Sequence, residues 1–225
     1  MQMFDLDLTR LLYVVPAIIL ALTIHEYAHA RVAYAFGDST ARDAARMTLN
    51  PFKHLDIVGA LMLIFVGFGW AKPVPINPWY FGPNRKQRIL WVSLAGPASN
   101  ILQALLGTGL MALMWHFVHD PGIFGFYLFN LLSYYVQINL SLAVFNLIPI
   151  PPLDGSKILA SLLPDRYFHI VLTLERYGFL ILMVLCFLPN ILSWLGLPAF
   201  DLLGILISVP AGWIRSLFFS LFGLY

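Results

Sequence analysis

The stretch Thr23-Ile24-His25-Glu26-Tyr27-Ala28-His29-Ala30 decides how this chain must be read, because it places ionisable side chains inside an apolar run over residues 11–32. A charged group at membrane depth costs at least about 2.5–3.5 kcal/mol on insertion scales, so such groups are rare and mark functional sites. His25 and His29 are four residues apart and share one helix face, where both rings can bind one metal ion. Glu26 lies beside that ion, where its carboxylate can activate water. The stretch therefore predicts a zinc site in a lipid bilayer.

The composition is typical of an integral membrane protein. Of the 225 residues, 60% are hydrophobic and 11% are charged, with a mean hydropathy of +0.81. Crossing a hydrocarbon core of about 30 Å takes roughly 20 apolar residues as a helix. Five runs are long enough, at residues 11–32, 89–115, 123–148, 168–188 and 200–221. The predicted fold class is an all-α polytopic membrane protein with about five to six transmembrane helices.

Charge, cysteine content and the N-terminal residues argue against several other kinds of protein and site. The net charge of +2 is too small to indicate nucleic-acid binding. The single cysteine, Cys186, excludes an intrachain disulfide and a cysteine-ligated metal cluster. Residues 1–10 lack a basic leader and no small-residue cleavage site follows, so we expect residues 11–32 to be a retained membrane helix.

The basic residues predict an orientation. If residues 11–32 cross from outside to inside and the later segments alternate, only Arg10 of the 13 basic residues lies outside, as the positive-inside rule requires. We expect a prokaryotic cell membrane, with the N-terminus outside and the C-terminus in the cytosol. At about 1.5 Å per residue from residue 11, His25 lies roughly 21 Å into the core, so the site should open toward the cytosol.

Residues 47–80 interrupt the helical pattern. Gly67-Phe68-Gly69-Trp70 is followed by four prolines within residues 73–83, which exclude a continuous helix. We predict extended structure over residues 47–80, as a β-hairpin-like loop that re-enters the membrane. Irregular backbone at that depth is tolerated only where protein or a water-filled cavity satisfies its polar groups. The loop should therefore border a hydrated cavity near His25.

A catalytic zinc site needs three protein ligands and one open position, so a third ligand must come from elsewhere in the chain. Asp154, His54 and Asp56 are the candidates. Asp154 is favoured because three prolines within residues 149–152 present it rigidly, at the start of a short helix expected over residues 156–163. An Asp at a helix start is ordinarily an N-cap, however, and this interpretation stays open.

Two further motifs have structural explanations. Gly96-Pro97-Ala98-Ser99-Asn100 consists of small and polar residues that allow close helix packing in lipid, with a kink at the proline. His116, His119 and Asp120 lie in a short outer loop, which we interpret as solvated rather than metal-binding.

Five motifs are present together in the expected order along residues 11 to about 178: His25-Glu26-Tyr27-Ala28-His29, Asn50-Pro51 with His54-Leu55-Asp56 and Gly59, Ala71-Lys72-Pro73-Val74-Pro75-Ile76-Asn77-Pro78, Ala95-Gly96-Pro97 with Asn100, and Asn146 with Pro152-Leu153-Asp154-Gly155. In this combination the chain resembles the site-2 protease family of intramembrane zinc metalloproteases, peptidase family M50. The resemblance implies an endopeptidase with one zinc ion per chain, held by His25, His29 and Asp154, in which Glu26 activates water.

The resemblance also implies how substrate is held. Asn146 is expected to help hold the substrate or the oxyanion, and residues 47–80 resemble the re-entrant loop of the family. Strand-like pairing of an unwound substrate with residues 67–74, which include Gly69 and Trp70, is our hypothesis for recognition. The expected partners are transmembrane protein substrates and the lipid bilayer, with no nucleic acid.

The predicted domain organisation is a single transmembrane metalloprotease domain over residues 1–225. Its catalytic core covers about residues 11–178, and its C-terminal helices about residues 167–222. Larger family members carry a PDZ module or a nucleotide-binding CBS pair, for which this chain has no room, so we expect no nucleotide-binding regulation here.

Three other functions remain open at this point. A prenyl-protein protease would need a third-ligand Glu on a later helix, and the only other glutamate, Glu175, lacks a metal-type motif. A catalytically silent helix-binding protein should lack Glu26, which is present. A metal transporter would carry polar ligands along several helices, whereas these spans are nearly bare of charge.

Overall fold

The fold is a bundle of long helices in which five could cross a membrane. The structure, a computed structural model, describes residues 8–59, 62 and 69–224. Within that part, the five helices long and apolar enough to cross are α1 Leu8–Ala35, α4 Arg85–Phe117, α5 Gly122–Leu147, α7 Phe168–Trp194 and α8 Leu202–Phe222. The described residues form no strand beyond one isolated β-bridge. The prediction of an all-α polytopic membrane protein is thus confirmed.

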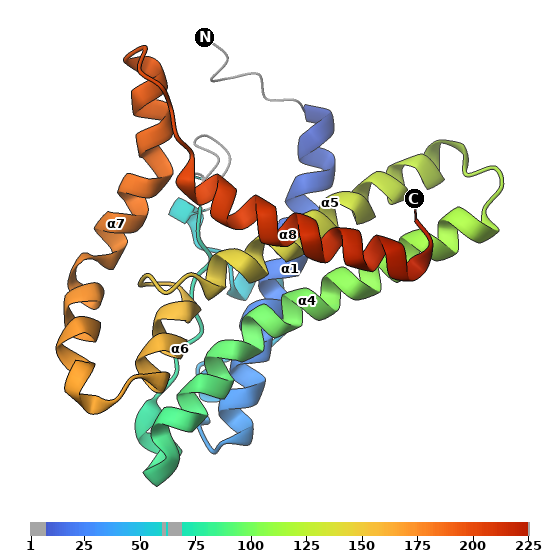
Figure 1. The fold of residues 1–225 in the computed structure, drawn as a ribbon. Helices are drawn as coiled ribbons and strands as arrows, with labels where there is room; N and C mark the ends of the chain where they lie inside the picture. The colour runs from blue at the N-terminus through green and yellow to red at the C-terminus, as the bar shows by residue number, and fades with distance from the viewer. Residues whose placement is uncertain (1–7, 60–61, 63–68, 225) are drawn as a thin grey trace.

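Helices α1, α4 and α5 pack against one another at the centre of the bundle, and α8 lies across α5 and α4 (Figure 1). Helix α7 stands to one side and meets the rest of the described chain at α6 and α8. The chain order and the positions of these helices match the five apolar runs of the sequence. The helix that carries His25 and His29, α1, therefore packs directly against α4 and α5, and we expect the predicted zinc site there.

Small side chains allow the close packing of α4, α5 and α8. Lipid tails are as apolar as leucine, so helices in a membrane associate through tight contacts rather than through exclusion of water. The buried cluster between these helices combines small residues with large ones that pack against them: Ala104, Ala112, Ala211 and Val136 with Met111, Leu140, Phe218 and Leu224. The opposite stripe of α4 is exposed and large, with Leu102, Leu106, Leu110 and Leu113 recurring at helical spacing. One face of α4 therefore serves packing and the other suits lipid.

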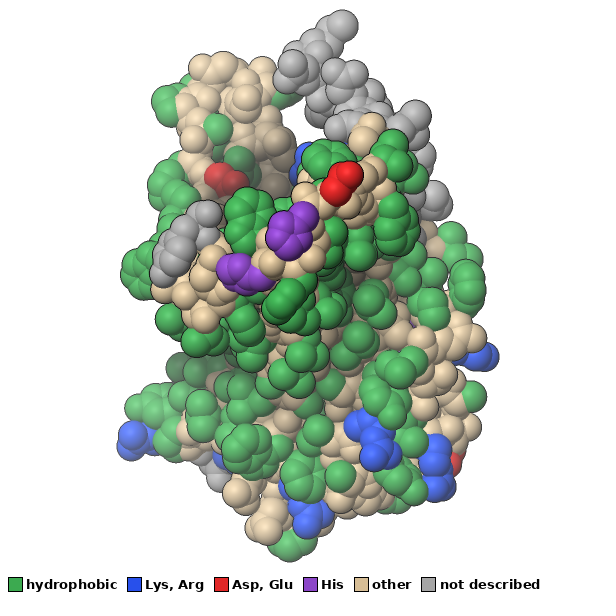
Figure 2. Space-filling model, turned by 90° about the vertical axis from the view of Figure 1, so that its right-hand side faces the viewer, with side chains coloured by type: hydrophobic (Ala, Val, Ile, Leu, Met, Phe, Trp, Pro, Cys, Tyr) green, Lys and Arg blue, Asp and Glu red, His purple; other side chains and the backbone are tan. Residues whose placement is uncertain are grey.

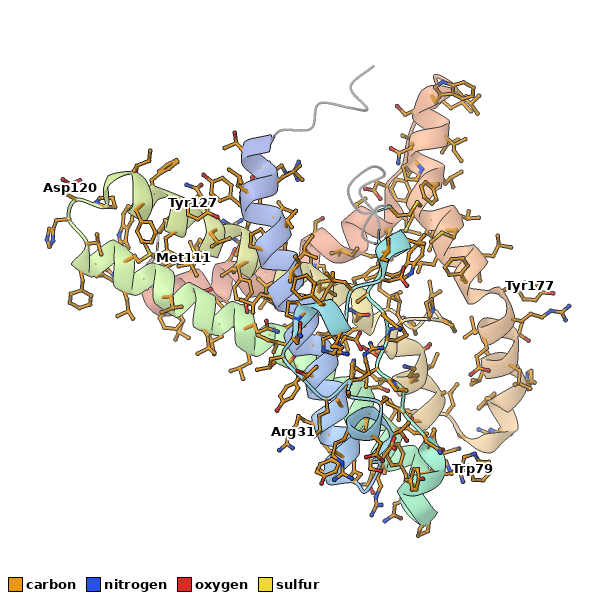
Figure 3. The ribbon with its side chains drawn as sticks, turned by 180° about the vertical axis from the view of Figure 1, so that it is seen from behind. Arg31, Trp79, Met111, Asp120, Tyr127 and Tyr177 are labelled. Carbon is orange, nitrogen blue, oxygen red and sulfur yellow. The ribbon has the colours of Figure 1, made fainter. Side chains whose placement is uncertain are left out.

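The surface separates apolar from charged side chains. Figure 2 shows hydrophobic side chains over most of one face, with most of its visible Lys and Arg gathered at the lower end. In Figure 3, Asp120 lies at the tip of the α4–α5 hairpin, and Arg31 and Trp79 lie at the opposite end. The end where basic side chains gather is the end that the predicted orientation places in the cytosol. The orientation itself stays a prediction.

The segment between α1 and α4 is mostly irregular. It contains α2 Thr40–Asp43 and the 3₁₀ turns η1 Pro51–Lys53 and η2 Pro78–Asn84. An antiparallel bridge joins Leu55 to Ala71, and the Lys72 N–H donates to the His54 carbonyl at 2.9 Å. The two flanks of the predicted hairpin therefore meet at one point. Residues 51–53, 57–59 and 78–80 are helical, however, so the prediction of extended structure over residues 47–80 is wrong for these parts. Residues 60–61 and 63–68, where its tip would fall, lie outside the described residues, so the re-entrant hairpin stays a prediction.

The corner between α5 and α6 brings the third candidate ligand back to α1. Helix α6 spans Asp154–Leu162, beginning two residues before the predicted start, and is followed by η3 Asp165–Tyr167. A side chain at Gly155 would collide with the carbonyl oxygens of Leu147 and Ile148. Glycine at this position therefore lets α6 begin directly against the end of α5, which places Asp154 beside the bundle.

Candidate metal centre

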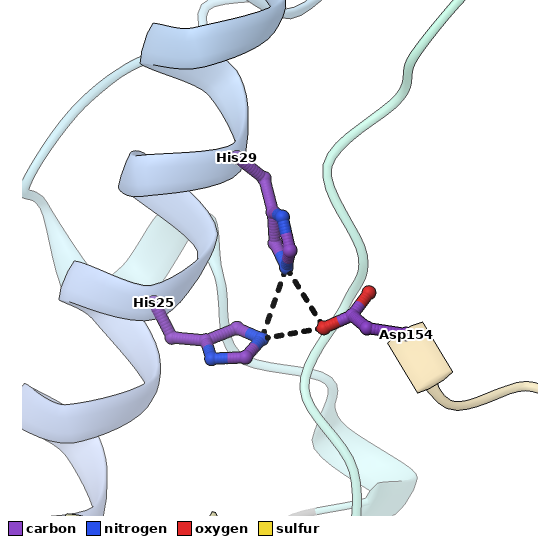
Figure 4. A group of neighbouring side chains, drawn as sticks. All are labelled: His25, His29 and Asp154. Atoms are coloured by element: carbon purple, nitrogen blue, oxygen red, sulfur yellow. Dashed lines mark hydrogen bonds and ion pairs between the residues drawn. The ribbon is translucent and has the colours of Figure 1, made fainter. Parts of the chain in front are cut away.

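Two histidines and one aspartate converge inside the bundle. His25 and His29 lie one turn apart on α1, and Asp154 is the first residue of α6; all three are buried. The His29 Nε2 atom lies 3.0 Å from His25 Nε2 and 3.1 Å from Asp154 Oδ2, and His25 Nε2 lies 3.3 Å from the same oxygen (Figure 4). Among the described residues these three form the only group of His, Cys, Asp and Glu side chains arranged to hold a metal ion.

The other ring nitrogen of each histidine is held by α4. His29 Nδ1 lies 2.7 Å from the Val92 carbonyl oxygen, which can only accept, so Nδ1 carries the ring proton. His25 Nδ1 lies 2.6 Å from Asn100 Oδ1. With Nδ1 protonated, the Nε2 atom of a neutral ring is a lone-pair acceptor. Both Nε2 atoms therefore present lone pairs toward Asp154, as metal ligands require.

Asn100 owes its orientation to α5. Asn139 Nδ2 donates to the Tyr135 carbonyl at 2.9 Å, which leaves Asn139 Oδ1 to accept from Asn100 Nδ2 at 2.7 Å. Asn100 Oδ1 is thereby directed at His25. The sequence prediction gave the motif around Asn100 a packing role, and this contact adds a functional one. The available signal was the cost of a buried amide in lipid, which demands a partner, but spacing alone could not name His25 as that partner.

The donor set fits a divalent metal ion. Three acceptor atoms that face one another at 3.0–3.3 Å repel unless a cation lies between them. Tetrahedral zinc with bonds of about 2.0–2.1 Å separates neighbouring ligand atoms by about 3.3 Å, close to these distances.

Glycine 96 on α4 leaves space for this group. A Cβ atom built on Gly96 would lie 2.6 Å from His25 Nε2 and would overlap His29 Nε2. Any larger residue there would push the two rings away from Asp154. The motif Gly96-Pro97 therefore permits close packing, as predicted, and the element that packs there is the metal site itself.

Glu26 lies next to His25 in sequence and is held by a different contact. One carboxylate oxygen, Oε2, accepts a hydrogen bond from the Val74 backbone N–H at 2.9 Å. Glu26 lines the same cavity as the three candidate ligands. The structure therefore brings together all four residues that the sequence singled out for zinc chemistry.

A cavity of about 320 Å³ opens at this group. Its walls come from α1, α4, α5, the start of α6, α7 and residues 69–76. Gly69, Trp70 and Asn146 all line it, as their predicted roles require. The Asn146 amide nitrogen donates to the Leu142 carbonyl of its own helix at 3.1 Å, and this bond does not use the amide oxygen, which is an acceptor.

The two alternative third ligands lie elsewhere. His54 is buried, and its Nε2 atom bonds to the Thr48 carbonyl oxygen at 2.8 Å. Asp56 Oδ1 accepts from the Gly59 N–H at 2.8 Å and so caps a turn. Both side chains stabilise the loop rather than face the histidine pair. Asp154, by contrast, is the first residue of α6 and not its N-cap, which is Leu153.

A polytopic helical protein with a buried His-His-Asp group and an adjacent glutamate defines the class of membrane metallopeptidases. Comparison with known proteins identifies the family within that class. The family model described as Peptidase family M50 matches residues 123–188. The Bacillus subtilis protein named "Putative zinc metalloprotease YwhC" is 43% identical over 178 residues, which cover 79% of this chain and 81% of that protein. The chain belongs to peptidase family M50, the site-2 protease family.

More distant relatives carry names of the same form. Rip2 of Mycolicibacterium smegmatis is 31% identical over 181 residues, which cover 78% of this chain and 67% of Rip2. MJ0611 of Methanocaldococcus jannaschii is 32% identical over 139 residues, which cover 60% of this chain and 62% of MJ0611. No solved structure matches the chain. The predicted family and the predicted zinc cofactor are thus confirmed, and the chain is a multi-pass membrane metalloprotease.

Replacing Gly96 by alanine should weaken zinc binding by at least about tenfold, because the new methyl group displaces both histidine rings. Chelator competition on purified protein measures this. Gly212→Ala on α8 is the matched control, since nothing lies within 4 Å of its added Cβ. Equal zinc affinity in the two variants would contradict the proposed position of the metal.

Proposed function

We propose that this chain is an intramembrane zinc endopeptidase, which hydrolyses peptide bonds in or near the transmembrane segments of membrane proteins. The observation that carries the proposal is the location of the His25, His29 and Asp154 group, with Glu26, in a cavity walled by membrane-length helices α1, α5 and α7. A substrate that reaches this cavity must itself lie at membrane depth. The proposed ligands are His25, His29 and Asp154.

Zinc held by His25, His29 and Asp154 would supply a Lewis acid that lowers the pKa of a water molecule toward about 7 and polarises a carbonyl group. Glu26 takes the proton of that water as general base and passes it to the leaving amine as general acid. The Val74 N–H holds the Glu26 carboxylate through Oε2, which leaves Oε1 for the proton. With the ring protons of His25 and His29 on Nδ1, their Nε2 lone pairs would be bound to the metal, so neither ring would compete for that proton.

The described loop suggests how an unwound substrate is held. In the bridge between Leu55 and Ala71, the hydrogen bond runs from Lys72 N–H to the His54 carbonyl, beside the bridged pair. In such a pair the N–H and C=O of Ala71 itself point away from Leu55. Ala71 also lines the cavity. We propose that this backbone edge pairs with the extended substrate by β-addition.

The remaining wall residues have proposed roles that follow from position. Asn146 is assigned to the substrate carbonyl or oxyanion, because its amide lines the cavity from the last turn of α5. Gly69 and Trp70 precede Ala71 and extend the proposed substrate edge along the cavity wall. The domain is proposed as one unit over residues 1–225, with its core over about residues 11–178.

The proposed orientation opens the cavity toward the cytosol. His29 lies in the second half of α1, whose last turns approach the end of the molecule where Arg31 is found (Figure 3). Basic side chains are favoured on the cytosolic side of membranes. A cut near that face would release a cytosolic fragment of the substrate.

Replacing Glu26 by glutamine should lower cleavage of a model transmembrane substrate by about 10²–10⁴-fold, because an amide cannot accept the water proton. Zinc content should stay at the wild-type level, since Glu26 is not a ligand. Quantified product bands from proteoliposomes give the rate. Glu175→Gln, the change at the chain's other glutamate, is the control and should cleave normally. Full activity in Glu26→Gln would rule out the enzymatic assignment.

Replacing Asp154 by alanine should abolish stoichiometric zinc binding, because it removes the carboxylate from a three-ligand site. His54→Ala, at the alternative ligand of the sequence analysis, should retain the metal. Elemental analysis of the purified variants measures both. Zinc loss only in His54→Ala would reverse the ligand assignment.

Replacing Ala71 by proline should raise KM about three- to tenfold with little change in kcat, because it removes one backbone donor from the substrate edge. Steady-state kinetics over a range of substrate densities in the bilayer separates the two constants. Ala71→Ser keeps the N–H and serves as the control. An unchanged KM in Ala71→Pro would count against pairing at this position.

A further inference from the structure

One buried arginine holds the backbone that touches Glu26. Arg46, which follows α2, donates from its Nη2 atom to the Lys72 carbonyl at 2.6 Å and to the Pro73 carbonyl at 3.3 Å. Its side chain is largely buried, with 8% of the residue exposed. Arginine at such a site acts as a rigid fork that can bind two neighbouring acceptors. Lys72 and Pro73 are thus held from one side by a single guanidinium group.

The Pro73 carbonyl and the Val74 N–H belong to the same peptide unit. That unit is planar, and in a trans peptide its C=O and N–H point in opposite directions. Arg46 therefore donates to the carbonyl at one edge of this peptide unit, while Glu26 Oε2 accepts from the N–H at the opposite edge. Fixing the plane through its carbonyl also fixes the direction of the N–H. A donor to the carbonyl further polarises the N–H and strengthens its bond to a carboxylate.

Val74 carries the only backbone N–H within residues 73–75. Residues 73 and 75 are prolines, which have no N–H. The Lys72 N–H already donates to the His54 carbonyl, and the Asn77 N–H donates to Asp38 Oδ2 at 2.7 Å. These two hydrogen bonds hold the segment on either side of Val74. Val74 is left between them with its N–H directed at Glu26.

We propose that Arg46 is a positioning residue for the reaction: through the Pro73–Val74 peptide plane it holds the carboxylate of Glu26 in place. This inference rests on the proposed function, because it assigns Glu26 as the proton-transferring group. Arg46 itself touches neither the metal ligands nor the catalytic carboxylate among its recorded contacts. Its effect should therefore reach the rate of the chemical step and leave the zinc site unchanged.

The primary test is Arg46→Met, which keeps the bulk of the side chain and removes both hydrogen bonds. We expect kcat to fall at least about tenfold, since small misplacements of a catalytic group cost up to about 10²-fold. KM should change less than about threefold. Zinc content should be retained, and the visible spectrum of the cobalt-substituted protein, which reports ligand geometry, should match that of wild type.

Two further single variants keep the test decisive. Arg88→Met is the matched control, because Arg88 also donates to a loop carbonyl, that of Phe36 at 3.3 Å, but does not contact residues 72–77 in any recorded bond; it should cleave like wild type. If Arg46→Met does not fold, Arg46→Lys takes its place. Lysine keeps the charge but lacks the planar fork, so we expect a smaller loss of kcat at full zinc content.

A double-mutant comparison of Arg46 and Val74 distinguishes positioning through the Pro73–Val74 peptide from a general effect on the loop. Val74→Pro removes the N–H that Glu26 accepts and should itself lower kcat. If Arg46 acts through that N–H, adding Arg46→Met to Val74→Pro should lower kcat less than about twofold further. Independent, multiplying losses would overturn the proposal. So would a wild-type kcat in Arg46→Met, or a changed cobalt spectrum.

The outcome also separates this inference from the proposed function. If Glu26→Gln is inactive while Arg46→Met and Arg46→Lys match wild type, only the positioning role is wrong. If Glu26→Gln cleaves normally, the proposed function fails, whatever the Arg46 variants do.

Discussion

Three acceptor atoms face one another inside this membrane protein, and the arrangement is stable only if a cation lies between them. The ring protons of His25 and His29 are committed to Asn100 and to the Val92 carbonyl, so neither Nε2 atom can satisfy the other or Asp154 without an added charge. The packing of α1, α4 and α5 serves this group. Gly96 makes room for the rings, and Asn139 orients the amide that orients His25.

The site also depends on a corner far along the chain. Prolines end α5 and leave α6 to begin at Asp154, and Gly155 allows the two helices to meet without a side chain between them. A carboxylate separated from His29 by 125 residues thereby lies 3.1 Å from its ring. Zinc held by the proposed ligands would join α1 to the start of α6, and so would be a structural link as well as a source of chemistry.

The loop before α4 has two proposed functions in one short segment. Its inner contacts, to His54, Arg46, Asp38 and Glu26, occupy the backbone groups of residues 72–77 and hold the segment still. Its Ala71 edge faces the cavity with the opposite set of groups. A rigid edge suits the recognition of an unwound chain, because little ordering free energy is then lost on binding. The same rigidity keeps the glutamate beside the metal site.

The sequence by itself determined the membrane fold, the five helical runs and the residues of the zinc motif, because apolar length and the four-residue spacing of His25 and His29 are local properties. It also favoured Asp154, although His54 and Asp56 stayed open. Tertiary structure places Asp154, and neither His54 nor Asp56, against the histidine pair, since only packing sets which distant side chain meets it. The contact of Asn100 with His25 and the contacts of Arg46 with residues 72 and 73 could not be predicted for the same reason. Each side chain acts through a hydrogen bond to a residue distant in the chain, and no local pattern records such a bond.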